Sequence, residues 1–427
     1  MQQTDRLKTF AIATLGCKVN QFESADMIEQ LRNAGWKQVS FNEAADLYLV
    51  NSCTVTGKSD AESRKLLRRA RRANPDATVV ATGCYAQVSP EALQALAEVD
   101  QVLGNREKVD ILRHITLGAD QVSSLTEQLE GPSLKLTSFA DHTRAFLQIQ
   151  SGCENGCSYC IVPIARGPNR SVAVTDVEEA VRRLAGEGYR EVVLTGIHLG
   201  AYQSGLTGLL RRLDATGAVE RLRLGSLEPN ELSDELLELI AGSSRICPHL
   251  HLPLQSGSDT VLHRMRRRYD AALYRQVVEK VAQRLPDAFL AADVIAGFPG
   301  ETEQEFRETC DLIAALPLAD LHVFPYSRRP GTVAAAMPDQ LPPAVIKERT
   351  TILNRLAAVK LKLFRQRFIG SHLEVLGQRH DPATGLISGL SRNYLEIDCP
   401  GTADDINRLR MVRVTALSRN RLVGEPA

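Results

Sequence analysis

Apolar runs alternate with helix-like stretches along the first part of this chain. Runs typical of buried strands occupy Thr9–Leu15, Leu47–Val50 and Ala77–Thr82. Apolar positions recur with the helical period in the segments between and after them, which are Glu23–Ala34, Ser59–Ala73 and Pro90–Ala97. Strands and helices in alternation predict an open parallel sheet that is covered by helices on both faces.

A second alternating series begins at Ala145. Its candidate strands are Ala145–Ile149, Glu191–Leu194, Arg221–Leu224, His249–Leu252, Phe289–Ile295 and Leu321–Phe324. Helical patterns lie between most of these strands, and a long helix-like stretch, Ala344–Phe368, follows them. Six strand–helix units are too few for the closed eight-stranded barrel, so we expect an open partial (βα)6 barrel.

The pattern changes again from His372, where short strand-like runs are separated by Gly, Pro and Asp. Such runs are typical of a small antiparallel β-barrel. The fold class expected is therefore α/β, with a small all-β barrel at the end. We expect domains at residues 8–118, 143–370 and 371–427, and a polar linker at residues 119–142 that contains Gly131 and Pro132.

Composition limits the function less than the motifs do. The 427 residues carry 51 basic and 51 acidic side chains, so net charge does not point to nucleic acid. No stretch approaches the roughly 20 apolar residues of a membrane span, and no secretory signal is visible at Met1–Phe10. We therefore expect a cytoplasmic protein without membrane partners, in which the nine cysteines are ligands or inert core residues rather than disulfides.

Cys153, Cys157 and Cys160 stand in the spacing C-x-x-x-C-x-x-C directly after the predicted strand Ala145–Ile149. Three thiolates on one short loop can hold a [4Fe–4S] cluster and leave one iron open. The open iron can chelate the amino and carboxylate groups of S-adenosylmethionine. The alternative is a zinc site or a reactive thiol cluster. Zinc would require a fourth Cys or His at a typical finger spacing, and none is present there.

Cys17, Cys53 and Cys84 are far apart in the sequence, but each directly follows a predicted strand of the N-terminal sheet. The carboxyl ends of parallel strands share one edge of a sheet, so the three thiols should converge there. Three ligands again imply a cluster with an open iron. The alternative is three buried, inert cysteines, because free Cys is among the most buried residue types. Three equivalent strand ends are harder to explain in that way.

The motifs around these cysteines resemble those of the radical S-adenosylmethionine superfamily, and in particular of its methylthiotransferases. The resemblance covers nearly the whole chain. It rests on the triad Cys153, Cys157 and Cys160, with the aromatic Tyr159 before the third cysteine, and on segments at Thr14–Gln21, Asn51–Thr56, Thr82–Gln87, Leu194–Gly200, His251–Ser258 and Asp293–Thr302. The C-terminal strands resemble the TRAM domain of those enzymes.

The first motif and the Leu194–Gly200 motif are most similar to the branch that modifies threonylcarbamoyladenosine at position 37 of tRNA. The chain departs from that branch at Ile164, where an aromatic residue is more usual.

The resemblance implies two [4Fe–4S] clusters that divide the work. The central cluster would cleave S-adenosylmethionine to a 5′-deoxyadenosyl radical, and the N-terminal cluster would supply sulfur for a methylthio group placed on C2 of the adenosine. It also implies an anticodon stem-loop as substrate partner, with an unidentified electron donor and an unidentified sulfur source. Tyr159 would lie near the adenine of the cofactor, and Gly196 and Glu228 are further candidates for cofactor contact or, alternatively, ordinary loop residues.

Three alternatives remain open. The substrate could be isopentenyladenosine in tRNA, or an aspartate of a ribosomal protein modified by the same chemistry. The chain could instead be a two-cluster protein for electron transfer or redox sensing, although such a protein gains nothing from an open iron. We expect RNA phosphates to bind the basic stretch Lys347–Arg367, and Arg166 and Arg170 are further candidates. We expect His198, His249 and His251 to line the barrel or its core.

Overall fold

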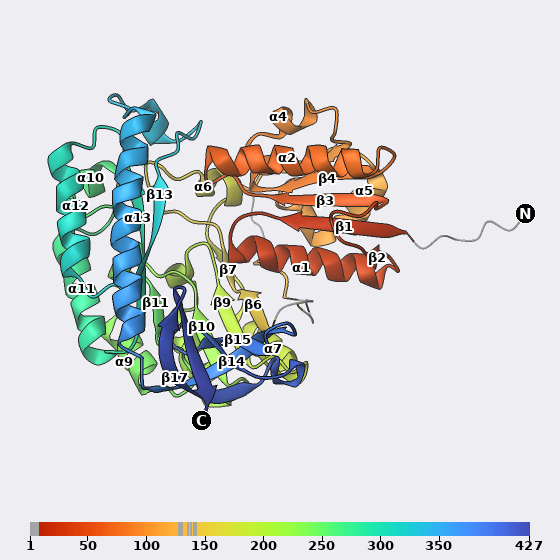
Figure 1. Ribbon diagram of the computed structural model, residues 1–427. Coiled ribbons are helices and arrows are strands. Elements are labelled where there is room, and N and C mark those ends of the chain that lie inside the picture. The colour runs from red at the N-terminus through yellow and green to blue at the C-terminus, as the bar shows by residue number, and fades with distance from the viewer. Residues whose placement is uncertain (1–7, 127–130, 135, 137–138, 140–142) are drawn as a thin grey trace, which may run out of the picture. The chain divides into compact units, whose positions relative to one another are not determined.

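A computed structural model describes residues 8–427 except 127–130, 135, 137–138 and 140–142 (Figure 1). The chain forms two compact units. Unit 1 combines the N-terminal segment up to Ala140 with Gln148–Val172 and Ser327–Ala335. Unit 2 contains the remaining chain, mainly Ala173–Tyr326 and Ala336–Ala427. The loop that carries Cys153, Cys157 and Cys160 therefore packs within the same unit as the N-terminal sheet.

The N-terminal sheet has five parallel strands in the order β2-β1-β3-β4-β5. Their bounds are β1 Thr9–Thr14, β2 Lys37–Gln38, β3 Leu47–Ser52, β4 Thr78–Gly83 and β5 Gln101–Val102. In this order the chain runs outward from β1 first to one side and then, through β3, to the other. The carboxyl ends of β1 and β3 therefore meet at a topological switch point, which is where open α/β sheets bind ligands.

Helices of unit 1 cover this sheet on both faces (Figure 1). Their bounds are α1 Lys18–Asn33, α2 Gly57–Ala73, α3 Cys84–Val88, α4 Pro90–Gln94 and α5 Ile111–Leu117, with α6 Val162–Arg166 after the cysteine loop. Core residues from both faces of β3 are fully buried, among them Tyr48 and Leu49. The expected parallel sheet is confirmed. Helix α1 begins at Lys18, earlier than the expected Glu23. Its first turn buries the polar Asn20 along with Val19, and a buried polar residue does not show in a pattern of apolar positions.

The six barrel strands of the second series are also confirmed, with ends that differ from expectation by a residue or two. They are β6 Arg144–Gln148, β9 Glu191–Thr195, β10 Arg221–Leu224, β11 His249–His251, β12 Phe289–Ala296 and β13 Asp320–Pro325. They form two three-stranded sheets, β10-β9-β6 and β11-β12-β13. Parallel bridges from Leu222 to Ile246 and from Ser226 to His251 link the two sheets into one open partial barrel.

The helices of unit 2 alternate with these strands. They are α7 Val174–Gly186, α8 Leu206–Thr216, α9 Asp234–Gly242, α10 Asp259–Arg264, α11 Ala271–Arg284, α12 Glu303–Ala315 and the long α13 Pro343–Gln366. Helix α12 begins with a capping box in which Thr302 and Glu305 satisfy each other's backbone N–H groups. Within the described part of the chain, no helix combines the length and apolarity that crossing a membrane requires.

The last five strands close into a barrel in the order β14-β15-β16-β18-β17. They are β14 His372–Asp381, β15 Leu386–Ser391, β16 Glu396–Pro400, β17 Leu409–Ser418 and β18 Arg421–Pro426. Phe289 and Ala291 of β12 pack with Leu395 and Ile397 in one apolar core. The small barrel therefore shares its core with the partial barrel instead of standing apart from it.

Two buried arginines tie the small barrel to the base of the partial barrel. Arg221 donates to the carboxylate of Glu374 at 2.8 Å and to the carbonyl oxygen of Leu390 at 2.9 Å. Arg223 pairs with Glu191 at 2.7 Å and donates to the carbonyl oxygen of Arg392 at 2.8 Å. Both side chains are fully buried. Removing the small barrel would take Glu374 from Arg221 and two backbone acceptors from the pair of arginines, and the loss of a partner of a buried charge is costly.

Candidate active site

The three N-terminal cysteines lie at the switch point of the sheet. Cys17 follows β1 and directly precedes α1, Cys53 follows β3, and Cys84 is the first residue of α3 after β4. Gly16 adopts a φ of +95°, and a Cβ there would approach the Sγ of Cys53 to 2.9 Å. A glycine is therefore needed to leave space at that sulfur. The structure brings together the three strand ends that the sequence pointed to.

The pKa values of these thiols reflect their mutual proximity. Loss of solvation raises the pKa of Cys53, and the neighbouring Cys84 and Cys17 raise it further. Cys17 is exposed, but neighbouring groups crowd its thiol, so loss of solvation raises its pKa as well; Arg166 opposes that rise and Cys84 adds to it. Three thiols with a cation beside them form a soft donor set that fits an iron–sulfur cluster.

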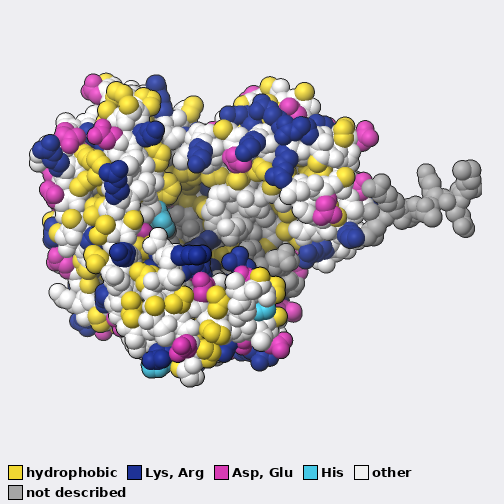
Figure 2. Space-filling view, in the orientation of Figure 1, with side chains coloured by type: hydrophobic (Ala, Val, Ile, Leu, Met, Phe, Trp, Pro, Cys, Tyr) yellow, Lys and Arg dark blue, Asp and Glu magenta, His cyan; other side chains and the backbone are white. Residues whose placement is uncertain are grey.

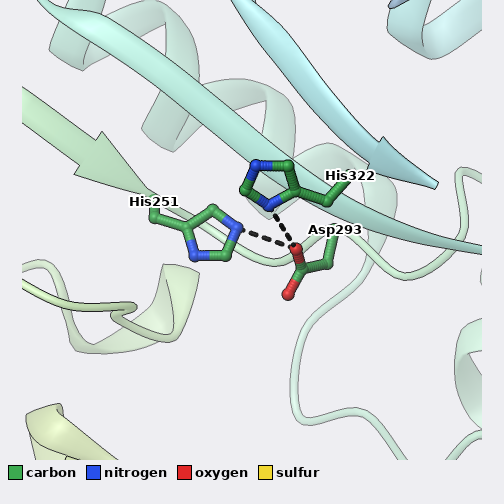
Figure 3. Close-up of side chains that lie close together, drawn as sticks. All are labelled: His251, Asp293 and His322. Atoms are coloured by element: carbon green, nitrogen blue, oxygen red, sulfur yellow. Dashed lines mark hydrogen bonds and ion pairs between the residues drawn. The ribbon is translucent and has the colours of Figure 1, made fainter. Parts of the chain in front are cut away.

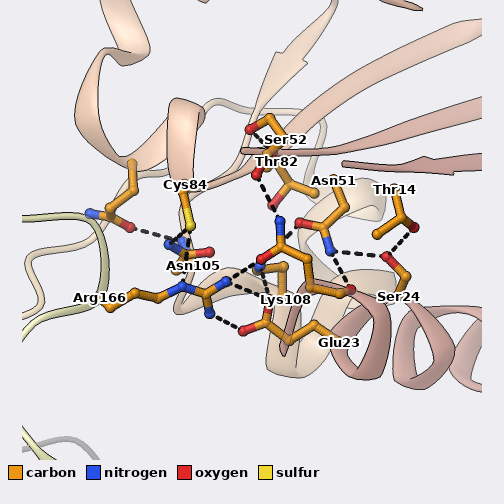
Figure 4. A network of polar contacts seen from close by, with 12 residues as sticks. Thr14, Glu23, Ser24, Asn51, Ser52, Thr82, Cys84, Asn105, Lys108 and Arg166 are labelled. Carbon is orange, nitrogen blue, oxygen red and sulfur yellow. Dashed lines mark hydrogen bonds and ion pairs between the residues drawn. The ribbon is translucent and has the colours of Figure 1, made fainter. Parts of the chain in front are cut away.

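A buried cation, Arg166, lies beside Cys84 (Figure 4). It is the last residue of α6, which follows the central cysteine loop, and only 2% of its side chain is exposed. Its Nε donates to the Sγ of Cys84 at 3.2 Å, and its terminal nitrogens donate to Asn20 and Glu23 of α1. One side chain thus joins the segment of the central cysteine loop to the N-terminal cysteine site.

The carboxylate of Glu23 pairs with a second cation, Lys108, whose Nζ also donates to Asn51 Oδ1 at 3.2 Å. Burial alone would raise the pKa of Glu23, but Arg166 and Lys108 lower it to about 2. Asn105 completes the surroundings of the thiol, with its Nδ2 3.9 Å from the Sγ of Cys84 and 2.7 Å from the carbonyl oxygen of Ala165. Arg166 is therefore engaged in a buried network, and the expectation that it binds RNA phosphate is wrong.

The central cysteines lie on a short loop fixed by backbone contacts at both ends. The N–H of Cys153 donates to the carbonyl oxygen of Gly167 at 3.1 Å, and the N–H of Cys160 to that of Cys157 at 3.1 Å. Gly152 has a φ of +76°, and a Cβ there would clash with the carbonyl oxygen of Pro168 at 1.8 Å. All three thiols are intermediate in exposure, as ligands of a cluster that also receives a small molecule should be.

The other candidates for cofactor contact lie where the sequence suggested. Tyr159 is half-buried within the cysteine loop. Gly196 directly follows β9 in unit 2. Glu228 lies just beyond the end of β10 and pairs with Arg267. Burial raises the pKa of Glu228, and Arg267 only partly offsets that rise. A half-buried carboxylate at a strand end is suited to bind a hydroxyl or an ammonium group, as expected.

Sequence reasoning missed one cluster of polar side chains in unit 2. His251, Asp293 and His322 come from the neighbouring strands β11, β12 and β13, and both rings contact one carboxylate oxygen (Figure 3). The sequence holds one sign of this cluster, which is the position of each residue within its strand. In the parallel register these positions place the three side chains on the same face of the sheet. His251 was expected to line the barrel, but its partners could be found only once the strand register was known.

Comparison with known proteins decides the family. Residues 9–104 match the model of the uncharacterized protein family UPF0004, and residues 147–313 match that of the radical SAM superfamily. The threonylcarbamoyladenosine tRNA methylthiotransferase MtaB of Bacillus subtilis is 38% identical over 96% of this chain and 94% of its own length. The protein of the same name from Aquifex aeolicus is 37% identical over 92% of this chain and 96% of its own length. The chain belongs to the radical SAM methylthiotransferases.

Membership of this methylthiotransferase family settles several expectations. The protein is an enzyme, so the alternative of an electron carrier or redox sensor is wrong. Its cofactors are S-adenosylmethionine and [4Fe–4S] iron–sulfur clusters. The fold agrees: the radical S-adenosylmethionine methyltransferase TsrM of Kitasatospora setae superposes with a TM-score of 0.57 over 77% of both chains, at 16% identity. Another relative, the tRNA-2-methylthio-N(6)-dimethylallyladenosine synthase of Cereibacter sphaeroides, is 33% identical over 97% of this chain and 97% of its own length.

The basic stretch expected to bind RNA is helix α13, and part of its charge is used internally. Arg349 pairs with Glu301 at 2.6 Å, and the Nζ of Lys360 donates to the carbonyl oxygens of Ala314 and Leu316. The basic residues of α13 whose side chains are exposed are Lys347, Arg355 and Lys362. In Figure 2, Lys and Arg side chains also gather where Figure 1 places α2, whose exposed basic residues are Lys58, Lys65, Arg68, Arg69 and Arg72.

Proposed function

We propose that this methylthiotransferase inserts a methylthio group at C2 of N6-threonylcarbamoyladenosine at position 37 of tRNA. The observation that carries the proposal is the pair of cysteine triads in a chain of this family. Its relatives named threonylcarbamoyladenosine tRNA methylthiotransferase match it at 34–38% identity over 87–98% of its length. Relatives named for dimethylallyladenosine match slightly less well, at 33–34%. Isopentenyladenosine tRNA is therefore the second candidate.

We propose that Cys153, Cys157 and Cys160 hold one [4Fe–4S] cluster and that Cys17, Cys53 and Cys84 hold another. When bound, the first supplies reductive cleavage of S-adenosylmethionine to a 5′-deoxyadenosyl radical, and the second supplies the sulfur that is transferred. Tyr159, Gly196 and Glu228 are proposed to contact S-adenosylmethionine. The domain boundaries proposed are residues 8–118, 143–370 and 371–427, with a linker at 119–142.

The protein's own groups position and screen these sites. Arg166 and Asn105 donate to the thiol of Cys84, Glu23 pairs with the guanidinium of Arg166, and Lys108 pairs with Glu23 in turn. A buried cation beside three thiolates offsets their negative charge, which favours the deprotonated, ligating form. Gly16 keeps the approach to Cys53 open. Positive charge is needed here because thiolates so close together repel one another.

We propose that the anticodon stem-loop is the part of tRNA that binds, because its unpaired bases can leave the stack without melting a duplex. The proposed contacts to RNA phosphates are the exposed Lys and Arg side chains of α13 and the small C-terminal barrel. The electron donor and the sulfur source are external partners still to be found. A tRNA substrate and reduced ligand thiols both favour the cytoplasm.

Iron counting and product analysis test the proposal together. Anaerobic reconstitution should give about eight irons per chain, at four per cluster, and Ala at Cys153, Cys157 and Cys160 should leave about half. The reconstituted enzyme should convert a stem-loop carrying threonylcarbamoyladenosine to its 2-methylthio form, measured by mass spectrometry of nucleosides. One zinc and no iron would refute the cluster assignment. Conversion of the isopentenyl stem-loop alone, or of a ribosomal protein alone, would refute the substrate.

A further inference from the structure

The partial barrel in unit 2 has one face at strands β11–β13 that is buried and another that becomes accessible beyond Ala291. In the parallel register, Asp293 lies beside His322, and His251 lies beside Ala291, two residues before Asp293 on β12. Because side chains alternate along a strand, His251, Asp293 and His322 share one face. Residues at the alternate positions, such as Leu250 and Ala292, are at most 1% exposed. The polar face is the one that a ligand can reach, since 54% of the His322 side chain is exposed.

The three side chains on this face form a defined hydrogen-bonded cluster (Figure 3). The Nε2 of His251 lies 2.8 Å from Asp293 Oδ1, and the Nδ1 of His322 lies 3.2 Å from the same oxygen. Ser226 Oγ contacts the other ring nitrogen of His251 and fixes the orientation of that ring. Burial would raise the pKa of Asp293, but the two histidines lower it to about 2, so the carboxylate is ionised at neutral pH.

The neighbourhood of the cluster combines this polarity with an apolar surface. Along the same face of β13, two residues beyond His322, Phe324 is 39% exposed and lies beside Ile295 of β12. Exposed aromatic rings offer stacking surface to a nucleobase that has left its stack. A polar cluster beside an apolar platform at the carboxyl half of parallel barrel strands matches the usual place and chemistry of a barrel's substrate site.

We propose that His251, Asp293 and His322 bind the N6 substituent of the target adenosine, and that His322 selects a polar substituent over an apolar one. This inference rests on the proposed function and names the part of the site that would distinguish its two candidate substrates. The threonylcarbamoyl arm carries a urea N–H, a hydroxyl and a carboxylate. The isopentenyl arm carries hydrocarbon only.

Each polar group of the threonylcarbamoyl arm finds a complement in the cluster. Both histidines contact Oδ1 of Asp293, so Oδ2 can accept the urea N–H or the hydroxyl. The Nε2 of His322, when protonated, can donate to the carboxylate of the arm. Solvent and substrate can reach the ring of His322, of which 54% is exposed, whereas the ring of His251 is held on both sides by Ser226 and Asp293.

An isopentenyl arm in the same place would remove the ionised Asp293 from water and give it no new partner. Sites built to hydrogen-bond a substrate group reject analogues that lack it far more strongly than apolar pockets reject an extra group. The partial exposure of the cluster moderates that penalty, because water can still reach His322. We therefore expect selectivity of about 10-fold to depend on His322, since a hydrogen bond to a charged group is worth about a factor of ten.

Stem-loop binding to the reconstituted holoenzyme tests the inference. Three anticodon stem-loops of one sequence would carry threonylcarbamoyladenosine, isopentenyladenosine or plain adenosine at position 37, and their Kd values would be measured by fluorescence anisotropy. The variants are His322→Leu and the conservative His322→Gln. His263→Leu, at an exposed position of α10, is the matched control.

His322→Leu should lower the preference for the threonylcarbamoyl over the isopentenyl stem-loop about 10-fold, and His322→Gln should retain part of it. Affinity for the plain adenosine stem-loop should not change in either variant, which also checks that both are folded. An unchanged preference in both variants would overturn the inference. Product analysis separates this inference from the proposed function. If the wild-type enzyme modifies threonylcarbamoyladenosine and both variants keep their preference, this inference alone is refuted. If the wild-type enzyme modifies only isopentenyladenosine, the proposed function is refuted.

Discussion

Replacing Arg166 with Met should destabilise unit 1 strongly even when no iron is bound. The guanidinium is 2% exposed and makes charged contacts with Glu23 and a hydrogen bond to the Sγ of Cys84 at 3.2 Å. Removing one partner of a buried ion pair typically costs about 3–5 kcal/mol, because the other charge stays buried. Lys108 still neutralises Glu23 in the variant, so the lower end, about 3 kcal/mol, applies here.

A loss of about 3 kcal/mol corresponds to a Tm decrease of about 6–12 °C for a unit of this size. The assay is thermal unfolding of the metal-free, reduced protein, followed by circular dichroism. Arg69→Met on the exposed face of α2 is the control, because surface changes usually stay within about 0.5 kcal/mol.

A double variant, Glu23→Gln with Arg166→Met, should lose less than the sum of its two single variants, since the two residues share one interaction. If Arg166→Met lowered Tm no more than Arg69→Met does, the buried network would not stabilise the protein as the contacts indicate.

Three further predictions concern the clusters, the RNA contacts and pH. Cys157→Ala should abolish 5′-deoxyadenosine formation, whereas Cys53→Ala should retain it and lose methylthio transfer; normal modification by Cys53→Ala would show that the N-terminal cysteines are structural. Reversing charge at three exposed positions of α13 should weaken binding of all tRNAs alike and lower the slope of log affinity against log salt by up to about 3; the positions are Lys347, Arg355 and Lys362. The matched set on α2 is Lys65, Arg68 and Arg69, and a larger effect there would move the RNA surface to α2. Asp293 has a pKa of about 2 in the fold against an ordinary 3.8, so its contribution to stability is complete above 3.8 and disappears as pH falls through about 2; Asp293→Asn should therefore lose less unfolding free energy than wild type over that range in urea titrations, and equal losses would refute the pairing.

The sequence predicted those parts of the site that depend on local pattern. Apolar periodicity located β1, β3 and β4, and the rule that parallel strands end at one edge then brought Cys17, Cys53 and Cys84 together. The central triad needed only its own spacing. Each of these inferences uses residues that are neighbours in the sequence, or the rule that parallel strands end at one edge of their sheet.

Contacts that join distant segments could not be predicted in this way. Arg166 looked like a surface residue because its partner Glu23 lies 143 positions earlier. Counting charge along Lys347–Arg367 could not reveal that Arg349 is buried against Glu301, since that pairing depends on how α13 packs. His322 joins Asp293 only through the register of β12 and β13. The small barrel appeared to be appended because Arg221 and Arg223 gave no local sign of holding it.

The central claim is methylthiolation of threonylcarbamoyladenosine by a cluster-bearing enzyme, and one measurement tests it most directly. Nucleosides from total tRNA would be quantified by mass spectrometry in cells that lack the gene and in the same cells complemented with wild type or Cys53→Ala. We predict that 2-methylthio-N6-threonylcarbamoyladenosine is absent without the gene, that its unmethylthiolated precursor accumulates, and that only wild type restores the product. Loss of the isopentenyl product instead, or an unchanged nucleoside profile, would contradict the claim.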